Sequence, residues 1–275
     1  MSAAADASIL ETPPKTVRGW PRARIIGYVL VGLWALAGAG LVVYLAISWR
    51  PDLVQKYGPR YLDGLGVTLL LVTISTVIGA LVSIPIAYAR TSKSAILSSL
   101  AYAYVYFFRG TPLLAQTFLI YYGLGSFRPE LEAVGLWGFF REAWYCAILA
   151  FSLNTAAYQA EILRGAIQSV PRGQWEAASS LGLHRLETLW KIILPQALIV
   201  ALRPYGNEVI LMVKGSAIVA IITVYDLMGV TRFVYSRTFD FQSYLWAALI
   251  YLAIVQTLDY LIGLIERRLT RHLIR

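Results

Sequence analysis

Cysteine and histidine are almost absent from this sequence. It contains one cysteine, Cys146, and two histidines, His184 and His272, which lie far apart along the chain. One thiol cannot form a disulfide within the chain, and two separated histidines do not have the spacing of metal ligands. We therefore expect neither a disulfide framework nor a metal site, and we interpret Cys146 as a packing residue in an apolar stretch.

Charged residues are also scarce. They make up 14% of the 275 residues, against 58% hydrophobic residues, whereas a soluble domain carries about a quarter charged residues. The formal net charge is +9, but the basic residues stand at the ends of apolar stretches and form no single run. Such basic ends are typical of the cytoplasmic anchors of membrane helices. The composition predicts an integral protein of the lipid bilayer and argues against nucleic acid as a partner.

The motifs of common enzymes are missing as well. The sequence has no Gly-x4-Gly-Lys-Ser/Thr segment to hold a triphosphate, no His-Glu-x-x-His pair for zinc, and no Ser/His/Asp set with a recognisable spacing. We therefore expect a chain that is not an enzyme, has no catalytic residue and binds no cofactor of its own.

Long apolar runs, by contrast, predict an all-α membrane protein with six spans. A helix needs roughly 20 apolar residues to cross a bilayer. The first run, residues 25–48, could also be a secretory signal peptide, because residues 35–37 resemble a cleavage site. The run continues past that site, which favours a retained helix. The other spans are predicted at residues 62–88, 113–124, 144–167, 194–213 and 244–265.

The distribution of Lys and Arg predicts the orientation of these spans, because loops rich in basic residues stay in the cytoplasm. Both chain ends and residues 173–195 are then cytoplasmic, and residues 1–24 form a flexible tail. Outer loops are predicted at 50–60 and 125–142, and a partly inserted segment with an outer helix at 214–241. Thr111 is a candidate N-cap for the span that begins at 113, with Pro112 in the first turn.

Polar residues inside predicted spans are costly and are therefore candidates for function. Asn154, Tyr158 and Glu161 recur at i, i+4 and i+7, which places them on one helix face. The span 194–213 is expected to break at Pro204 and Gly206, and a broken helix exposes backbone groups to a polar solute. The predicted solute pathway consists of Asn154, Tyr158, Glu161, Asn207 and Glu208.

Structural ion pairs are the alternative interpretation of the same carboxylates. Glu161 can pair with Arg164 at i+3. Glu208 can pair with Arg203 or Lys214. The sequence does not decide between pathway residues and ties between helices.

Residues 173–195 predict two short helices joined at an elbow. Residues 174–181 are good helix formers, with paired alanines that give a face which another surface can approach closely. Gly182 can adopt a positive φ and end this helix. Residues 184–193 form an amphipathic second helix, and Pro195 is tolerated where the next helix begins.

The spacing Glu-Ala-Ala, three residues, Gly, nine residues, Ile-x-Leu-Pro resembles the EAA loop in permease subunits of bacterial ABC importers. In that family the loop is a cytoplasmic coupling helix that docks on the ATPase subunit; an ordinary surface hairpin is the alternative. The positions that the resemblance assigns to coupling are Glu176, Ala177, Ala178, Gly182, Leu194 and Pro195.

Three further segments extend the resemblance. Residues 109–113 resemble polar-amino-acid permeases, and residues 154–161 and 207–212 resemble permease subunits for histidine, lysine, arginine and ornithine or for opines. The resemblance implies a type I ABC importer permease fold over residues 60–275. That family usually has five core spans, which makes residues 25–48 an extra transmembrane helix.

The resemblance also implies location and partners. It implies a multi-pass protein of the bacterial inner membrane that pairs with a homologous permease subunit, as a heterodimer or a homodimer. Two ATPase subunits would bind ATP and Mg, and a periplasmic solute-binding protein would deliver the solute. The implied function is import of amino acids, either basic ones or opines. The alternatives are a secondary transporter driven by an ion gradient and a membrane scaffold that transports nothing.

Overall fold

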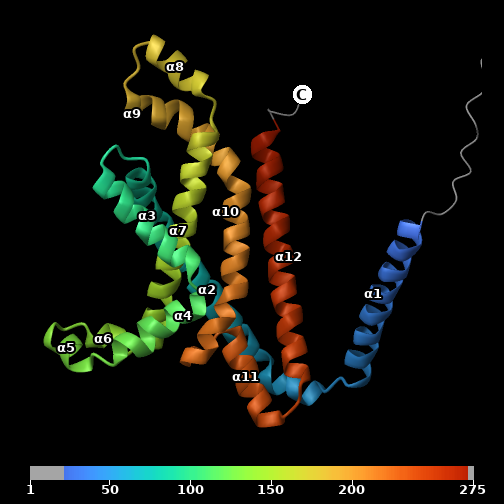
Figure 1. Ribbon diagram of the computed structural model, residues 1–275. Helices are drawn as coiled ribbons and strands as arrows, with labels where there is room; N and C mark the ends of the chain where they lie inside the picture. Colours follow the sequence, from blue (N-terminus) through green and yellow to red (C-terminus); the bar gives the residue numbers. More distant parts are fainter. Residues whose placement is uncertain (1–21, 272–275) are drawn as a thin grey trace, which may run out of the picture. The chain divides into compact units, whose positions relative to one another are not determined.

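The computed structural model describes residues 22–271, and these residues are helical without any strand. The predicted tail therefore lies outside the described residues, apart from residues 22–24, which begin the first helix. The α-helices in Figure 1 are α1 (Arg22–Ile47), α2 (Pro51–Arg90), α3 (Ala95–Gly110), α4 (Leu113–Phe118), α5 (Arg128–Ala133), α6 (Trp137–Phe140), α7 (Ala143–Ser169), α8 (Arg172–Ser180), α9 (Arg185–Thr188), α10 (Leu194–Ser216), α11 (Leu227–Thr238) and α12 (Gln242–Thr270). The all-α prediction is confirmed.

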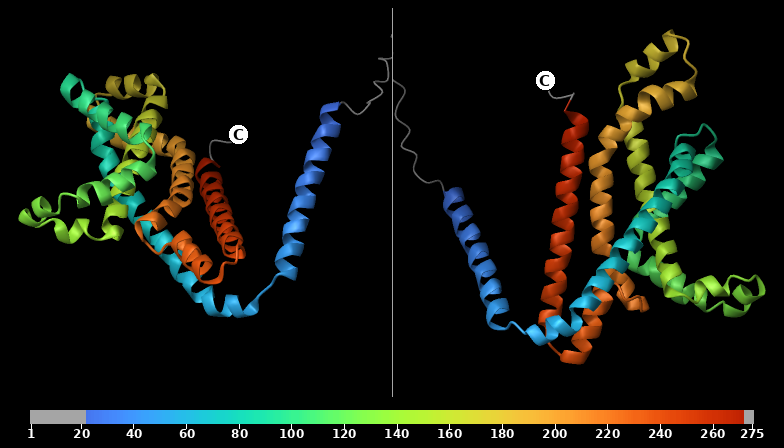
Figure 2. Two further views of the ribbon diagram at one scale, coloured as in Figure 1. Left: turned by 60° about the horizontal axis from the view of Figure 1, so that its bottom comes forward. Right: turned by 180° about the vertical axis from the view of Figure 1, so that it is seen from behind.

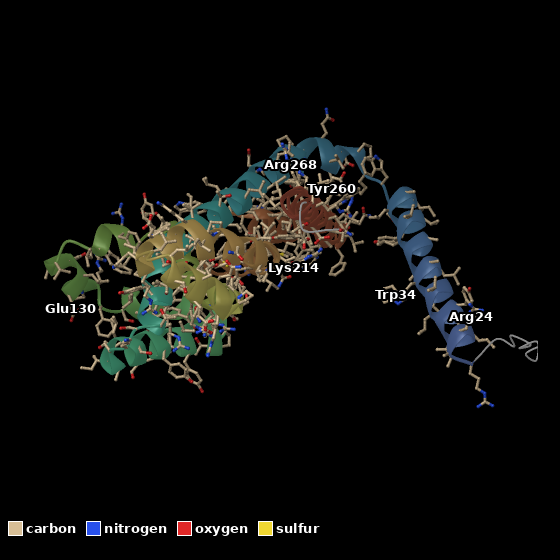
Figure 3. The ribbon with its side chains drawn as sticks, turned by 90° about the horizontal axis from the view of Figure 1, so that it is seen from above. Arg24, Trp34, Glu130, Lys214, Tyr260 and Arg268 are labelled. Atoms are coloured by element: carbon tan, nitrogen blue, oxygen red, sulfur yellow. The ribbon has the colours of Figure 1, made fainter. Side chains whose placement is uncertain are left out.

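Helix α1 belongs to a separate unit, residues 1–51, and is described by itself. It has 26 residues, and its candidate membrane span has a mean hydropathy of 2.2. None of its side chains is buried, and Trp34 projects from the helix with 78% of its surface exposed (Figure 3). Length and composition therefore suit a bilayer-crossing helix.

Within residues 52–271, the second unit, α2, the continuous helix Arg185–Ile222 and α12 are also long and apolar enough to cross a bilayer. Helix α7 has 27 residues, enough for a span, but its polar residues make it less apolar. The apolar helix Leu113–Gly123 is shorter. The total of six spans stays a prediction.

The predicted outer loop at residues 50–60 is wrong, because α2 begins at Pro51. Charged residues oppose burial in lipid but do not oppose helix formation. Proline suits the start of a helix, and Asp52 in the first turn interacts favourably with the helix dipole. The extension is held by Tyr57, which packs with Val230 and Val234 of α11.

Small residues let the helices around α7 approach closely. Ala147, Ala150 and Ala157 of α7 are fully buried. A Cβ atom at Gly79 of α2 would lie 2.4 Å from Cγ2 of Thr155 on α7, so only glycine permits this crossing, which Figure 2 shows from behind. Close backbone approach through small residues is a common way for membrane helices to pack.

The expected break of the span 194–213 is also wrong, because α10 runs through Pro204 and Gly206 without interruption. Pro204 removes one hydrogen bond, the one that its N–H would donate to the carbonyl of Val200, but the rest of the helix remains paired. Gly206 instead permits close packing, since a Cβ atom there would lie 2.7 Å from Ile262 of α12. A π-helical turn at Leu189–Ile193 precedes Pro195 and joins α9 to α10.

Opposite ends of the second unit carry different elements. The hairpin α8–α9 projects at the end where α12 finishes, and α5, α6 and α11 lie at the other end (Figures 1 and 2). The predicted loop 125–142 thus contains the short helices α5 and α6. This arrangement separates the predicted coupling segment from the segments predicted to face the outside.

Candidate functional site

Asn154 connects α7 to the junction between α3 and α4. Its Nδ2 donates to the carbonyl oxygen of Phe108 at 2.9 Å and to Oε1 of Gln116 at 3.0 Å. Nε2 of Gln116 donates in turn to the backbone and hydroxyl oxygens of Thr111. Because Asn154 and Gln116 are both buried, this network positions the end of α3 against α7.

The prediction that Thr111 is the N-cap of α4 is wrong. Its hydroxyl and its backbone N–H both bond to the carbonyl oxygen of Phe107, so that it ends α3. Pro112 takes the N-cap position of α4. The reason is that α3 extends to Gly110. The last carbonyl groups of a helix have no partner within it, and Thr111 donates to one of them.

Glu208 is a buried carboxylate that forms no ion pair in the described part of the chain, although the charge of Arg109 is near enough to act on it. Oε1 accepts a hydrogen bond from the hydroxyl of Thr155 at 3.0 Å, and 6% of the residue is exposed. The alternative pairing is wrong: Arg203 pairs with Glu266 of α12 at 2.9 Å, and Lys214 forms no ion pair with any residue between 22 and 271. Buried ionisable groups without a counter-ion in a membrane protein are candidates for function.

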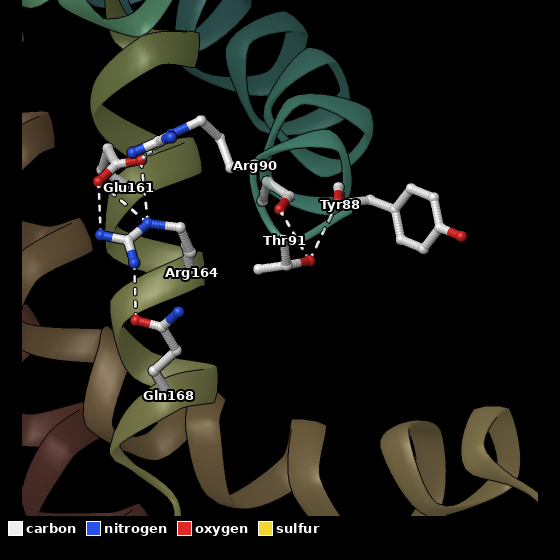
Figure 4. Close-up of polar contacts among 7 residues, drawn as sticks. Tyr88, Arg90, Thr91, Glu161, Arg164 and Gln168 are labelled. Atoms are coloured by element: carbon white, nitrogen blue, oxygen red, sulfur yellow. Dashed lines mark hydrogen bonds and ion pairs between the residues drawn. The ribbon is translucent and has the colours of Figure 1, made fainter. Parts of the chain in front are cut away.

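Glu161, in contrast, forms ion pairs that join two helices. Its carboxylate pairs with Arg164 of the same helix at 2.7 Å and with Arg90 of α2 at 3.0 Å. Arg164 also donates to Gln168, and Figure 4 shows this chain of contacts beside the end of α2. Two cations pair with Glu161, so the ion pair of the alternative interpretation is present, and the role of Glu161 in the solute pathway stays a prediction.

Tyr158 and Glu161 line a cavity of about 420 Å³ between α3, α7 and α10. The cavity also contains Arg109, whose guanidinium carbon lies 5.2 Å from the centroid of the Tyr158 ring. The hydroxyl of Tyr158 donates to the backbone oxygen of Arg109 at 3.5 Å. Arg109 was missed as a site residue; the signal was its place at the start of the resembling segment 109–113.

Asn207 points away from Glu208, although the two are adjacent in sequence. Asn207 is exposed and lines a second cavity, of about 310 Å³, together with Arg203 of α10 and Asp259 of α12. Successive residues of a helix point about 100° apart, so Glu208 faces α7 while Asn207 faces α12. The five predicted pathway residues therefore do not form one surface.

The segment 173–195 contains the predicted elbow. Gly182 has a φ of +73° and ends α8, and a Cβ atom there would meet nothing within 4 Å. The glycine is thus required by its backbone conformation and not by lack of space. Further along, Pro195 is exposed in the first turn of α10, and Leu194 packs against a cluster that contains Ala87 and Ala160.

The two motif alanines do not share a face. Glu176 and Ala177 are exposed, but 1% of Ala178 is exposed, because it packs inside the hairpin. The surface open to another protein includes the apolar side chains of Leu181, Leu186 and Trp190, of which 78%, 58% and 58% is exposed. Exposed apolar side chains of this kind are candidates for contact with another protein.

No group of three or more potential metal ligands occurs among residues 22–271. The polar side chains in and near the two cavities are amides, hydroxyls, arginines and carboxylates. These groups bind polar organic molecules through hydrogen bonds and ion pairs.

Curated proteins with similar sequences are permeases. The chain is 46% identical over 223 residues to the nopaline transport system permease NocM of Agrobacterium fabrum, covering 81% of this chain and 92% of that protein. It is 38% identical to the arginine permease ArtM of Escherichia coli, covering 78% and 96%. It is 41% identical to the octopine permease OccM of Rhizobium meliloti, covering 74% and 84%.

Solved structures have the same fold. An amino acid ABC transporter crystallised with histidines matches with a TM-score of 0.71 and 38% identity, covering 78% of this chain and 96% of that one. The inward-facing MetNI methionine ABC transporter matches with a TM-score of 0.64 and 19% identity, covering 77% and 96%. The helical arrangement around α7 and α10 is therefore that of a type I ABC importer permease.

A family model assigns the chain directly. It describes the inner membrane component of binding-protein-dependent transport systems, and it matches residues 75–271. The matched region runs from within α2 to the end of α12, includes both cavities and the hairpin α8–α9, and leaves α1 outside. Sequence, fold and curated relatives agree, and the chain belongs to the family of binding-protein-dependent transport system inner membrane components.

Proposed function

We propose that this chain is the permease subunit of an ATP-driven importer for basic amino acids or opines. Its curated relatives carry the names of arginine, nopaline and octopine transport systems. The observation that carries the proposal is Glu208, a buried carboxylate with a hydroxyl partner and no ion pair among the described residues. A buried carboxylate of this kind attracts a guanidinium or ammonium group.

Permeases of this family are not enzymes, and they work with ATPase and binding-protein partners and with a second permease. For this chain we propose two ATPase subunits that bind ATP and Mg, a periplasmic solute-binding protein, and a homologous permease as a heterodimer or a homodimer. Both chain ends and the hairpin α8–α9 would be cytoplasmic. Helix α1 would be an additional span beside the family core.

The proposed mechanism is alternating access. ATP binding would close the ATPase pair and move the hairpin α8–α9 with it. The π-helical turn at Leu189–Ile193 continues directly into α10, so a displacement of the hairpin would reach the helix that carries Glu208. The contacts of α10 with α7 and α12 would then change, and hydrolysis would restore them.

The test is uptake of radiolabelled arginine by the complete importer in vesicles. Glu208→Gln removes the charge but keeps the shape, and we expect it to lower uptake at least about tenfold, as loss of one charge-assisted bond predicts. Glu130→Gln, on the exposed helix α5 (Figure 3), is the matched control. Full uptake by Glu208→Gln would refute the proposal, and uptake without the ATPase would favour a transporter driven by an ion gradient.

A further inference from the structure

The cavity between α3, α7 and α10 contains one cation without an ion pair among the described residues, Arg109, whose charge acts at longer range on the buried carboxylate of Glu208. Its two charged residues are Arg109 and Glu161. Glu161 already pairs with Arg90 and Arg164, whereas Arg109 forms no ion pair within the described ranges. The cavity wall is therefore positive at Arg109, and an anionic group on a bound molecule would be attracted there.

We propose that Arg109 binds the carboxylate of the transported solute in this cavity. The inference rests on the proposed function and adds a residue to the site. A guanidinium group presents a planar fork of N–H donors that matches the two oxygens of a carboxylate. Tyr158 holds this fork in place, since its ring lies 5.2 Å from the guanidinium carbon and its hydroxyl bonds to the backbone of Arg109.

The remaining wall of the cavity suits the rest of an amino acid. Ile162 and Val200 offer apolar contact for an aliphatic stem. Pro204 has no N–H for the carbonyl of Val200, which leaves that oxygen able to accept a hydrogen bond from an ammonium group. The volume of about 420 Å³ falls in the usual range for small-molecule sites.

Arginine and agmatine test the inference, because agmatine is arginine without its carboxylate. Binding of each is measured at equilibrium on the complete purified importer, without the binding protein. Wild type is expected to bind arginine at least about tenfold more tightly than agmatine. Arg109→Gln is expected to weaken arginine binding about tenfold and to change agmatine binding less than about twofold. Arg109→Lys should lie between, because lysine keeps the charge without the fork.

Arg128→Gln is the matched control. Arg128 also stacks on an aromatic ring, at 5.2 Å from the centroid of Trp137, and it pairs with the exposed Glu132, but it lies outside the cavity. We expect this variant to bind both compounds as wild type does.

Three results would overturn the inference. The first is that the wild-type importer binds agmatine as tightly as arginine, a result that does not depend on any variant. Another is an equal loss of both compounds in Arg109→Gln, which would indicate a purely structural role and leave the proposed function intact. The third is unchanged arginine binding in Arg109→Gln. If wild type binds neither arginine nor an opine such as nopaline or octopine, the proposed function is refuted together with the inference.

Discussion

Glu161 and Glu208 show how neighbouring helices give the same residue type two different roles. Both are carboxylates within the helical bundle. Glu161 lies between Arg90 and Arg164, so its charge is balanced and serves to hold α2 against α7. Glu208 has Thr155 as its hydrogen-bond donor and forms no ion pair among the described residues, which is why we propose it as the group that attracts a cationic solute.

The two carboxylates are expected to respond in opposite ways to neutralisation. Glu161→Gln leaves two arginines without a counter-ion and should lower the free energy of unfolding by roughly 1–3 kcal/mol. Glu208→Gln removes a buried charge that has no ion pair among the described residues and should leave stability unchanged or increase it. Thermal unfolding of both variants in the same detergent measures the difference. Equal stability of Glu161→Gln and wild type would contradict the assignment of Glu161 as a tie.

At the scale of elements, the motif residues of the hairpin α8–α9 occupy different positions: one is buried, one forms the turn, and two are exposed. Ala178 packs inside the hairpin, and Gly182 makes the turn with its positive φ. Glu176 and Ala177 remain on the outer surface. Burial of one alanine and exposure of the next follows from the helical repeat, which separates adjacent side chains by about 100°.

Cysteines placed at the two alanines test which surface of the hairpin meets the ATPase. Ala177→Cys should form cross-links to the ATPase subunit, because its side chain is exposed. Ala178→Cys should react much less, because 1% of that residue is exposed. Gel electrophoresis after cross-linking, with ATP present or absent, measures both. If neither cysteine captures the ATPase while the importer still hydrolyses ATP, the hairpin is not the coupling element.

At the scale of the molecule, α1 and the remaining helices are separate units. Helix α1 has no buried side chain and lies outside the region matched by the family. The second unit contains all the buried clusters, both cavities and the hairpin. The residues proposed for solute binding and for coupling therefore all belong to the second unit.

Removal of residues 1–48 should consequently leave a functional permease. We expect the truncated chain to insert, to assemble with its partners and to import arginine within about twofold of wild type, because α1 has no buried side chain and lies outside the region matched by the family. Removal of residues 1–60 is the informative comparison, since it also deletes Tyr57 from its cluster with Val230 and Val234 and should lower stability. Failure of the shorter truncation to assemble would show that α1 is required.

Much of the fold could be predicted from local sequence. The lengths of the apolar runs predicted long helices, and the structure contains them. Gly182 predicted the turn that ends α8. Two boundaries were wrong for physical reasons that sequence rules do not weigh. Residues 51–60 are helical because Tyr57 finds a partner on α11, and Pro204 stays within a helix because the rest of α10 is held by α7 and α12.

The sequence by itself determined that this protein is a helical membrane protein with a turn at Gly182, because hydropathy, helix length and a positive φ depend on residues that are close in the chain. Tertiary structure decided which polar residues are available. Arg90 is 71 residues from Glu161, and Thr155 is 53 residues from Glu208. Such pairs exist because the helices cross, and their crossing gives Glu161 two ion pairs while it leaves Glu208 and Arg109, the residues proposed for solute binding, without one among the described residues.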